Sequence, residues 1–311
     1  MKTSIIIVNH NTTKVLIDCV NSVFKYENPD DFEIKIVDNA SEDDSKKLID
    51  ELSNEFKNVS TIYLEELKSF SHANNIGIKD SKGEYIIIMN PDIIFEYPVI
   101  DKLILIFNSN KNIGAAAPAL VGTDGKLQQF YYQKYPTIKQ FIFFHSIILR
   151  FFYKKSFFIN KYWIDSRINL QDKKQFSVNH IPGAFFVIPR KIIEDIGMMD
   201  ENFMLFFEDT DFSYRINQKY KLIVDTSLQV THLGGASFKE MQWWIYGRFI
   251  VSMIYFSKKH YSKINFKTLK NIAIFNAHCM LLIERLLKLF GKNDNFRIKK
   301  YNNFLKLAKE I

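Results

Sequence analysis

The chain of 311 residues is poor in cysteine, glycine and proline. Its two cysteines, Cys19 and Cys279, lie far apart in segments with helical spacing, which excludes a disulfide framework and a thiolate metal site and favours a reducing cytoplasm. With 11 glycines, 7 prolines and no internal period, the chain is not fibrous, repetitive or disordered. Because 47% of the residues are hydrophobic, it can build one large α/β domain, with or without an appendage.

Long apolar runs are also missing. Two stretches come nearest to a membrane span, residues 141–152 and 243–256, but charged or polar side chains interrupt both, namely His145 and Arg150 in the first and Arg248 in the second. A spanning helix needs about 20 apolar residues, so none is expected.

Acidic residues are outnumbered by basic ones, which gives a formal charge of +8. Such a charge suits nucleic acid, anionic lipid or a phosphorylated substrate. No helix-turn-helix, zinc or RNA-binding signature is present, so nucleic acid is not expected as a partner. Basic and aromatic residues crowd the C-terminal part, which predicts peripheral contact with a membrane surface. A solvated helix face beside ordinary core aromatics is the alternative.

Strand-like and helix-like segments alternate through the first half of the chain. Short apolar runs that predict strands occur at residues 4–8, 33–37, 61–64 and 85–89. The first run is too short for a signal-peptide core. This alternation predicts a mostly parallel central sheet flanked by helices. After the second run, Ser41 is predicted to cap a helix whose first turn carries the acidic residues 42–44.

The second half is less regular, and residues 126–180 receive no assignment. Beyond them we predict, in order, a strand at 181–188, a helix at 190–196, a helix after an acidic cluster, and strands at 221–224 and 228–231. From about residue 239 the pattern is helical. The predicted organisation is an α/β domain over residues 1–238 and a helical, basic and aromatic extension over residues 239–311.

Polar residues follow two of the predicted strands. Asp38 comes after the strand at 33–37, and Asp92 comes shortly after the strand at 85–89. Ligands of open α/β sheets bind beyond the carboxyl ends of the strands, so both carboxylates are candidate ligand-binding groups. A simple turn or capping role is the alternative for Asp38.

Three carboxylates, Glu208, Asp209 and Asp211, occupy four positions between aromatic side chains. Carboxylates held close together repel one another and have perturbed pKa values, as in sites that handle a proton or a cation. A helix N-terminus that attracts acids through its dipole is the alternative. On a helix, Glu208 and Asp211 share a face that Asp209 does not. Arg215, one turn beyond Asp211, is predicted to pair with it.

Six segments together resemble the inverting nucleotide-sugar glycosyltransferases of family 2, and within them the rhamnosyltransferase-like branch. The resemblance covers about residues 3–238 and implies the GT-A fold. The segments follow the order of the family's motifs: Ser4-Ile5-Ile6-Ile7-Val8-Asn9, Val37-Asp38-Asn39-Ala40-Ser41, Ala73-Asn74-Asn75-Ile76-Gly77, Met89-Asn90-Pro91-Asp92, Ile196-Gly197-Met198-Met199-Asp200-Glu201 with Glu208-Asp209-Thr210-Asp211, and Thr231-His232.

The resemblance assigns nucleotide binding to five residues: Asn9, Asp38, Asn74, Asn75 and Asn90. Asp38 can accept the imino N–H of uracil or thymine, so the implied donor is a dTDP- or UDP-sugar. Asn74 and Asn75 belong to a loop that opens a helix near the nucleotide, where their amides would hold ribose or phosphate oxygens. Helix capping explains these two residues equally well.

A divalent metal, Mg²⁺ or Mn²⁺, is implied at Asp92 and His232. Asn90-Pro91-Asp92 occupies the place of the family's metal-binding Asp-x-Asp motif, with an amide instead of the first carboxylate. An amide oxygen is the weaker ligand for a hard cation, so tight binding is not expected. The rhamnosyltransferase-like branch often carries Asn-Pro-Asp here. Without the resemblance, a lone histidine such as His232 would usually be structural.

Asp209 is the implied catalytic base. In an inverting transfer one carboxylate removes the proton of the acceptor hydroxyl as it attacks the anomeric carbon. Glu208 and Asp211 would orient the acceptor, hold the loop or raise the proton affinity of Asp209. The small residues Gly183-Ala184 would leave room for the donor sugar.

The implied function is transfer of L-rhamnose from dTDP-rhamnose to a surface-polysaccharide or polyprenyl-linked oligosaccharide acceptor, in the cytoplasm at the inner face of the membrane. A UDP-sugar-dependent member using galactofuranose, glucose or N-acetylglucosamine is one alternative, and a catalytically degenerate nucleotide- or lipid-binding protein is another. A nucleotidyltransferase is disfavoured because residues 9–12 lack a glycine-rich basic signature. A dinucleotide-dependent oxidoreductase is disfavoured because no G-x-G-x-x-G follows the first strand.

Overall fold

The computed structural model describes residues 2–137, 141, 163–234, 243–292, 294–309 and 311. The chain divides into two compact units. The first comprises Met1–Gln133, Asp165–Asn202 and Glu208–Lys239, and the second comprises Lys134–Ile164, Phe203–Phe207 and Glu240–Ile311. The last passage between the units follows Lys239, and the organisation into a domain over residues 1–238 and an extension over residues 239–311 stays a prediction.

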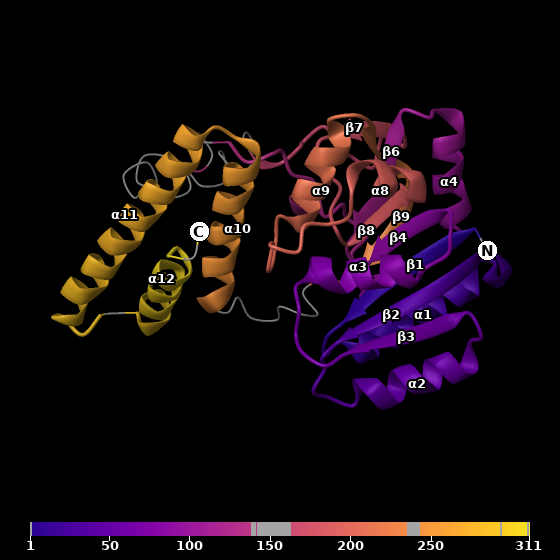
Figure 1. Cartoon of the computed structure of the whole chain (residues 1–311), viewed down its shortest axis with the longest axis horizontal. Helices are drawn as coiled ribbons and strands as arrows, with labels where there is room; N and C mark the ends of the chain where they lie inside the picture. Colours follow the sequence, from indigo (N-terminus) through magenta and orange to yellow (C-terminus); the bar gives the residue numbers. More distant parts are fainter. Residues whose placement is uncertain (1, 138–140, 142–162, 235–242, 293, 310) are drawn as a thin grey trace. The chain divides into compact units, whose positions relative to one another are not determined.

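The first unit is built on one mixed sheet (Figure 1). Along the sheet the strands are β3 (Val59–Leu64), β2 (Phe32–Asn39), β1 (Thr3–Asn9), β4 (Tyr85–Met89), β8 (Phe185–Pro189), β6 (Ile113–Val121), β9 (Lys221–His232) and β5 (Ile93–Ile94), with β7 (Gln175–Val178) also paired to β9. Of these nine strands in the described part of the chain, six point the same way, namely β1, β2, β3, β4, β6 and β9. The predicted mostly parallel sheet is confirmed.

Helices cover both faces of this sheet. On one face lie α1 (Thr13–Tyr26), α2 (Ser45–Glu55) and α4 (Ile100–Ser109), and on the other lie α3 (Phe70–Asp80), α8 (Arg190–Ile196) and α9 (Glu208–Asn217). The short 3₁₀ turns η1 (Pro29–Asp31) and η2 (Gln129–Tyr131) lie in connections.

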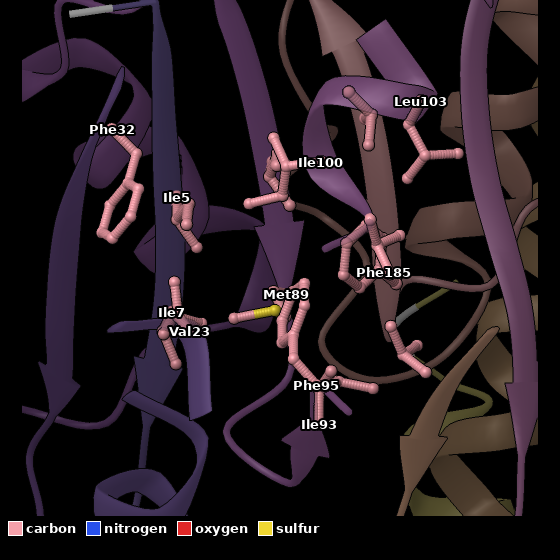
Figure 2. Close-up of a cluster of buried hydrophobic side chains, with 14 of the residues drawn as sticks. Ile5, Ile7, Val23, Phe32, Met89, Ile93, Phe95, Ile100, Leu103 and Phe185 are labelled. Atoms are coloured by element: carbon pink, nitrogen blue, oxygen red, sulfur yellow. The ribbon is translucent and has the colours of Figure 1, made fainter. Parts of the chain in front are cut away.

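The apolar strands supply both cores because neighbouring residues of a strand face opposite ways. In β1, Ile5 and Ile7 belong to the cluster under α1 and α4, which Figure 2 shows together with Met89 and Phe185. Ile6 belongs to the cluster under α8 and α9. A strand buried on both faces therefore reads as an uninterrupted apolar run, as β1 and β4 do.

Gly77 lets α3 lie close against β1. A Cβ at this position would be 2.5 Å from Cγ2 of Ile6, closer than two carbon atoms can approach. The glycine of the segment from Ala73 to Gly77 thus has a packing reason.

Three local predictions need correction. Ser41 does not cap a helix: α2 begins at Ser45, and the Ser41 hydroxyl donates to Asp38 instead. The strand predicted from residue 181 begins at Phe185. The two strands predicted at 221–224 and 228–231 are one strand, β9, whose register with β6 shifts after Asp225.

The second unit contains α10 (Trp243–His260), α11 (Lys263–Lys288) and α12 (Asn295–Leu307), which contact one another. The predicted helical character is confirmed for the described residues of this segment. Within the unit, the Ser252 hydroxyl donates to the Leu205 carbonyl at 2.8 Å and the Tyr261 hydroxyl to the Pro136 carbonyl at 2.6 Å. Along the described part of the chain, no helix combines the length and apolar character that crossing a bilayer requires.

Candidate active site

The polar residues predicted from the sequence gather at one edge of the first unit's sheet. The parallel strands β1, β2 and β4 end there, and so does β9, because its last residue, His232, pairs with Ile93 just after Asp92. Strand β8 runs the other way, so its amino end lies at the same edge: Asn90 N–H donates to the Ala184 carbonyl at 3.0 Å. Strand ends and one strand start therefore surround a common region.

Asp38 is held rigidly at the end of β2. Its Oδ1 accepts hydrogen bonds from the Asn9 amide at 2.9 Å and from the Ser41 hydroxyl at 2.6 Å, and its Oδ2 accepts from the Ser41 N–H at 3.1 Å. Asp38 is 4% exposed and Asn9 fully buried. The Asn9 amide also contacts hydroxyls of Thr13 and Ser45. The buried Asn9 amide thus fixes the orientation of the Asp38 carboxylate.

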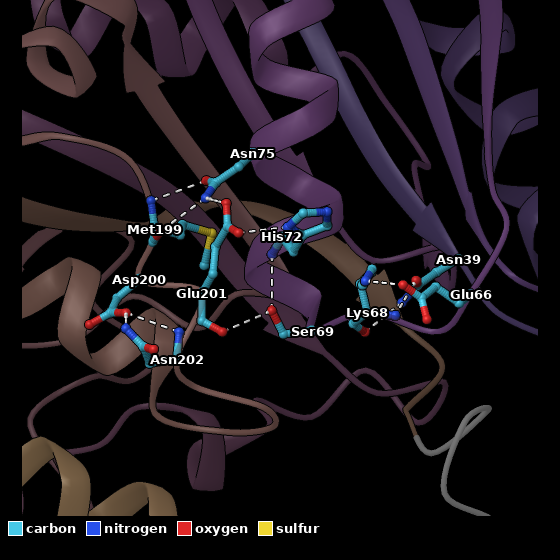
Figure 3. A network of polar contacts seen from close by, with 10 residues as sticks. All are labelled: Asn39, Glu66, Lys68, Ser69, His72, Asn75, Met199, Asp200, Glu201 and Asn202. Atoms are coloured by element: carbon cyan, nitrogen blue, oxygen red, sulfur yellow. Dashed lines mark hydrogen bonds and ion pairs between the residues drawn. The ribbon is translucent and has the colours of Figure 1, made fainter.

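Asn74 and Asn75 lie in the first two turns of α3, and both are buried. The Asn75 amide is bonded on both sides to the loop that precedes the acidic cluster: it donates to the Met199 carbonyl at 2.9 Å and to Glu201 Oε1 at 2.8 Å, and it accepts from Met199 N–H at 3.2 Å (Figure 3). Asn74 donates to the Phe70 carbonyl at 2.8 Å. The structure places Asn75 as a tether of this loop, and nucleotide binding by either amide stays a prediction.

The same loop is held at two further points (Figure 3). His72 Nδ1 lies 2.6 Å from Glu201 Oε2, and the hydroxyl of Ser69, which caps α3, donates to the Glu201 carbonyl at 3.2 Å. Hydrogen bonds from Asn75 and His72 lower the pKa of Glu201. The segment Met199–Glu201 is therefore fastened to α3 by charge-assisted contacts.

Asp92 and His232 face each other at the candidate metal position, where His232 Nε2 lies 3.4 Å from Asp92 Oδ1 and both residues are buried. His232 Nδ1 lies 2.7 Å from Oε1 of Gln128, whose amide nitrogen donates to the His232 carbonyl at 2.8 Å. An Nδ1–H donated to Gln128 leaves the Nε2 lone pair directed at Asp92, the usual arrangement of a metal-binding histidine. These two residues therefore fit a hard or borderline divalent cation whose other ligands come from a bound phosphate or water.

No third protein ligand joins them, since no group of three or more His, Cys, Asp or Glu side chains converges within the described ranges. Asn90 is partly exposed beside them and bonds through its backbone.

Gln128 and Tyr131 belong to this site but carry no sequence signal of their own. The turn at residues 122–125 folds the chain back so that Leu127 pairs with Val121, and Gln128 N–H donates to the Leu120 carbonyl at 2.9 Å. The Tyr131 ring then lies edge-on to His232, with ring centres 5.0 Å apart. In the sequence, only the turn residues 122–125, directly after the strand β6, indicate that the chain folds back here.

Asp209 lies in the first turn of α9, directed toward the loop before β8. Its Oδ2 accepts from Gly183 N–H at 2.9 Å, its Oδ1 accepts from Thr210 N–H at 2.7 Å, and His180 Nε2 lies 3.2 Å from Oδ2. The side chain keeps 21% of its surface exposed. Burial by itself would raise the pKa of Asp209, but His180 and the two amides outweigh burial and lower it.

The pKa of Glu208 shifts in the opposite direction. Burial and the neighbouring Asp209 charge raise its pKa to about 8, and its Oε2 has no hydrogen-bond partner among the described residues. The proton of this pair therefore resides on Glu208 at neutral pH. Of the three roles considered for Glu208 and Asp211, the lowered pKa of Asp209 disfavours an increase in its proton affinity.

Asp211 is fully buried and forms the predicted ion pair with Arg215, whose Nε lies 2.9 Å from Oδ2. Arg215 also donates to the carbonyls of Ile196 at 2.9 Å and Met198 at 2.7 Å. This pair fastens α9 to the end of α8. A role of Asp211 toward an acceptor stays a prediction.

His180 is the functional candidate that the sequence did not reveal. It is 4% exposed, and the loop after β7 brings it to Asp209, 29 residues later in the chain. Gly183 lies against Asp209, since a Cβ there would be 3.3 Å from Asp209 Cβ, and its role of leaving room for the donor sugar stays a prediction. The glycine permits the backbone N–H to reach the carboxylate.

The sequence and the fold of this chain resemble those of known glycosyltransferases. The chain is 23% identical over 244 residues to the uncharacterized glycosyltransferase YfnE of Bacillus subtilis, a match that covers 70% of this chain and 61% of that protein. It therefore spans less than two thirds of this relative. Two solved structures share its fold: the mannosyltransferase PcManGT of Pyrobaculum calidifontis in complex with GDP-Man and Mn²⁺ (TM-score 0.56, 13% identity, 99% of this chain and 86% of that one) and residues 1–349 of TarS of S. aureus in complex with UDP-GlcNAc (TM-score 0.55, 14% identity, 100% and 91%).

These likenesses confirm the predicted α/β fold of the GT-A type with C-terminal helices. Residues 4–197 match the profile described as "Glycosyl transferase family 2", and this match spans more than half of the chain. The segments from Ser4 to Glu201 that carry the sequence resemblance lie almost entirely inside it. This chain belongs to glycosyl transferase family 2.

Proposed function

We propose that this protein transfers a sugar from a nucleoside-diphosphate donor to an acceptor hydroxyl with inversion at the anomeric carbon, Asp209 acting as the base. The observation that carries the proposal is the state of Asp209: an ionised, partly exposed carboxylate held by the Gly183 and Thr210 amides beside His180. A base fixed in one orientation and one protonation state is what a single-displacement transfer requires.

The donor would bind along the strand ends. Asp38, which Asn9 and Ser41 hold in one orientation, would accept the imino N–H of a pyrimidine base. Asp92 and His232 would hold Mg²⁺ or Mn²⁺, which when bound neutralises charge on the departing diphosphate. The Gln128 contact keeps the His232 ring oriented for this task.

For the donor sugar we favour L-rhamnose from dTDP-rhamnose, because Asn90-Pro91-Asp92 is the form of the motif that the rhamnosyltransferase-like branch often carries. Galactofuranose, glucose and N-acetylglucosamine on UDP are the alternatives; the complex of TarS with UDP-GlcNAc and that of PcManGT with GDP-Man show that this fold accommodates different donors. The acceptor we favour is a surface polysaccharide or polyprenyl-linked oligosaccharide, met in the cytoplasm at the inner face of the membrane.

The test is nucleoside-diphosphate release by the purified chain across a panel of dTDP-, UDP- and GDP-sugars with Mg²⁺ or Mn²⁺. One donor is expected to be turned over, and Asp209→Asn to lower the rate by about 10²- to 10⁴-fold because the base is lost. Asp195→Asn, which alters an exposed aspartate of α8, serves as the matched control and should retain the rate.

Calorimetric titration of the same donors separates the remaining outcomes. A donor that binds but is never transferred, even with oligosaccharide acceptors, would favour the catalytically degenerate alternative. Transfer that survives in Asp209→Asn would remove Asp209 from the role of base.

A further inference from the structure

The net charge of the chain is concentrated at its carboxyl end. Residues 263–311 contain 11 Lys and Arg against 3 Asp and Glu, whereas residues 1–262 contain 31 of each. The surplus of this final segment therefore equals the formal charge of +8 of the whole chain. Helices α11 and α12 carry it, in the second unit.

One side of α11 is exposed and apolar. Phe275, Leu282 and Leu286 are 71%, 56% and 52% exposed, and Leu289 and Phe290, directly after the helix, are 78% and 76% exposed. Spacings of three, four and seven residues place such side chains along one side of a helix. We call these five residues the apolar face of α11.

The apolar face of α11 is not the side by which this helix packs in its unit. Leu269, Ala273 and Ala277 are buried, lie on the opposite side of the helix by their spacing, and so face inward, where α11 contacts α10 and α12. The helix thus has two apolar sides, one already covered within the unit and one exposed.

Cations border the apolar face, and exposed carboxylates of α11 do not. Arg285 and Lys292 are exposed, with Lys292 in the turn after the helix, whereas Lys288, also exposed, lies by its spacing toward the packed side of the helix. The single acidic residue of α11, Glu284, is fully buried, where it accepts from Asp294 N–H at 2.7 Å and pairs with Arg297 at 3.3 Å. The side of α11 that solvent reaches is therefore apolar and positive.

The combination of apolar and positive side chains on one side of α11 indicates which partner this side binds. A second copy of the helix could cover an apolar stripe, but paired helices normally set opposite charges along their flanks, and here cations would meet cations. An anionic bilayer supplies both an apolar interior for the side chains and negative headgroups for the flanking cations. We propose that the apolar face of α11 and its bordering cations form a docking surface for an anionic lipid bilayer, on which the helix lies parallel to the membrane plane.

The proposal goes beyond the transferase activity and is tested without it. The full chain is sedimented with vesicles of pure phosphatidylcholine or of an equal mixture of phosphatidylcholine and phosphatidylglycerol, at low and high salt. Binding is expected to the mixed vesicles only and to weaken as salt rises. Arg285→Gln with Lys292→Gln is expected to weaken it by about 30-fold, the product of two losses of about 1 kcal/mol each.

Matched variants separate the surface from general effects. Lys57→Gln with Lys111→Gln removes the same charge from exposed lysines of the first unit and should leave vesicle binding unchanged. Phe275→Ser with Leu286→Ser should abolish binding, whereas Leu105→Ser, at a residue 60% exposed on α4, should not. Circular dichroism checks that each variant keeps its helices.

Three results would overturn the proposal: no binding to the mixed vesicles, equal binding to both vesicle types, or loss of binding in the first-unit variants as large as in the α11 variants. Analytical ultracentrifugation of the unmodified chain supplies a further decisive result. If it shows a dimer that Phe275→Ser with Leu286→Ser dissociates while vesicles are not bound, the apolar face covers a second copy instead.

Discussion

Glu208 and Asp209 are neighbours in the chain, yet their surroundings drive their pKa values in opposite directions. Consecutive residues of a helix point about 100° apart, so one carboxyl enters the apolar interior while the other meets Gly183 and His180. The two carboxyl groups therefore differ in protonation near neutral pH. The neutral Glu208 then leaves Asp209 as the only charge of the pair near neutral pH.

Glu208 makes a specific contribution to the pH dependence of stability. Its pKa rises from 4.5 to about 8 on folding, so the folded chain holds a proton that the unfolded chain releases between these values. Stability is therefore expected to fall as pH rises through this window. Glu208→Gln removes this component and should flatten the decline, by an amount on the order of a few kcal/mol at high pH, in urea unfolding at about pH 6 and about pH 9.

The matched variant is Glu194→Gln, an exposed glutamate of α8, which should keep the pH dependence of the unmodified chain. An unchanged slope in Glu208→Gln would mean that Glu208 is ionised in the folded protein.

His180 is expected to act through Asp209 as a positioning residue. Replacing it in His180→Leu removes the imidazole that favours ionised Asp209, so the acidic limb of the kcat/KM profile should move upward by about one pH unit. His180→Gln, which keeps a hydrogen-bond donor, should restore part of the rate at neutral pH. The measurement is the pH profile of nucleoside-diphosphate release, with His278→Gln on the exposed surface as control.

A lower rate in His180→Leu with an unmoved acidic limb would contradict this role. The loss would then come from packing around a buried side chain.

At the scale of elements, the sequence predicts those helices and strands whose pattern lies within one continuous segment. The apolar runs of β1 and β4 are recovered, because burial on both faces of a strand is visible in consecutive residues. Ser41 fails as a predicted cap because its hydroxyl donates to Asp38, three residues earlier, and does not contact the first turn of a helix.

His180 and Gln128 escape sequence reasoning for a related reason. Each acquires its role from a residue far along the chain, Asp209 for the first and His232 for the second. Such pairings depend on the positions of β7 and β8 in the strand order and on the turn after β6. Local periodicity does not encode either of them. The proximity of Asp92 and His232 is predictable only because the family resemblance assigns both residues to one metal site.

The loop Met199–Glu201 is expected to depend on a single amide of α3. Asn75→Ala removes three hydrogen bonds and leaves Met199 N–H without its partner, which should lower the free energy of unfolding by about 2–3 kcal/mol. Asn54→Ala, at an exposed position of α2, should change it by less than about 0.5 kcal/mol. Equal effects of the two substitutions in urea unfolding would show that the loop is held by other contacts.

For the whole molecule, the chain does not divide at a single point. Phe203–Phe207, just before Glu208, belongs to the second unit, where the Phe203 ring lies 4.8 Å from that of Tyr255 and the Phe207 ring 5.2 Å from that of Phe249. The residue before the acidic cluster, Phe207, also adopts a positive φ of 66°, a strained conformation for an aromatic residue that needs support from its surroundings. That support comes from α10.

Truncation after Lys239 is therefore expected to yield an aggregating chain rather than a stable domain. Removing α10 exposes Phe203 and Phe207, which are 1% and 4% exposed in the full chain, together with Trp163 at 6%. Size-exclusion chromatography and thermal unfolding of residues 1–239 beside the full chain check this. A monomer that unfolds cooperatively would instead show that residues 1–239 fold without the helical extension.

The interleaved path of the chain also limits how this protein could be recombined. Between its two units the chain passes five times, after residues 133, 164, 202, 207 and 239. A chimera that exchanges the sheet-bearing unit for that of a relative, in order to change the donor, would need compatible junctions at all five places. Under the proposed binding of the donor along the strand ends, donor preference is thus more readily altered by point substitutions there than by exchange of whole units.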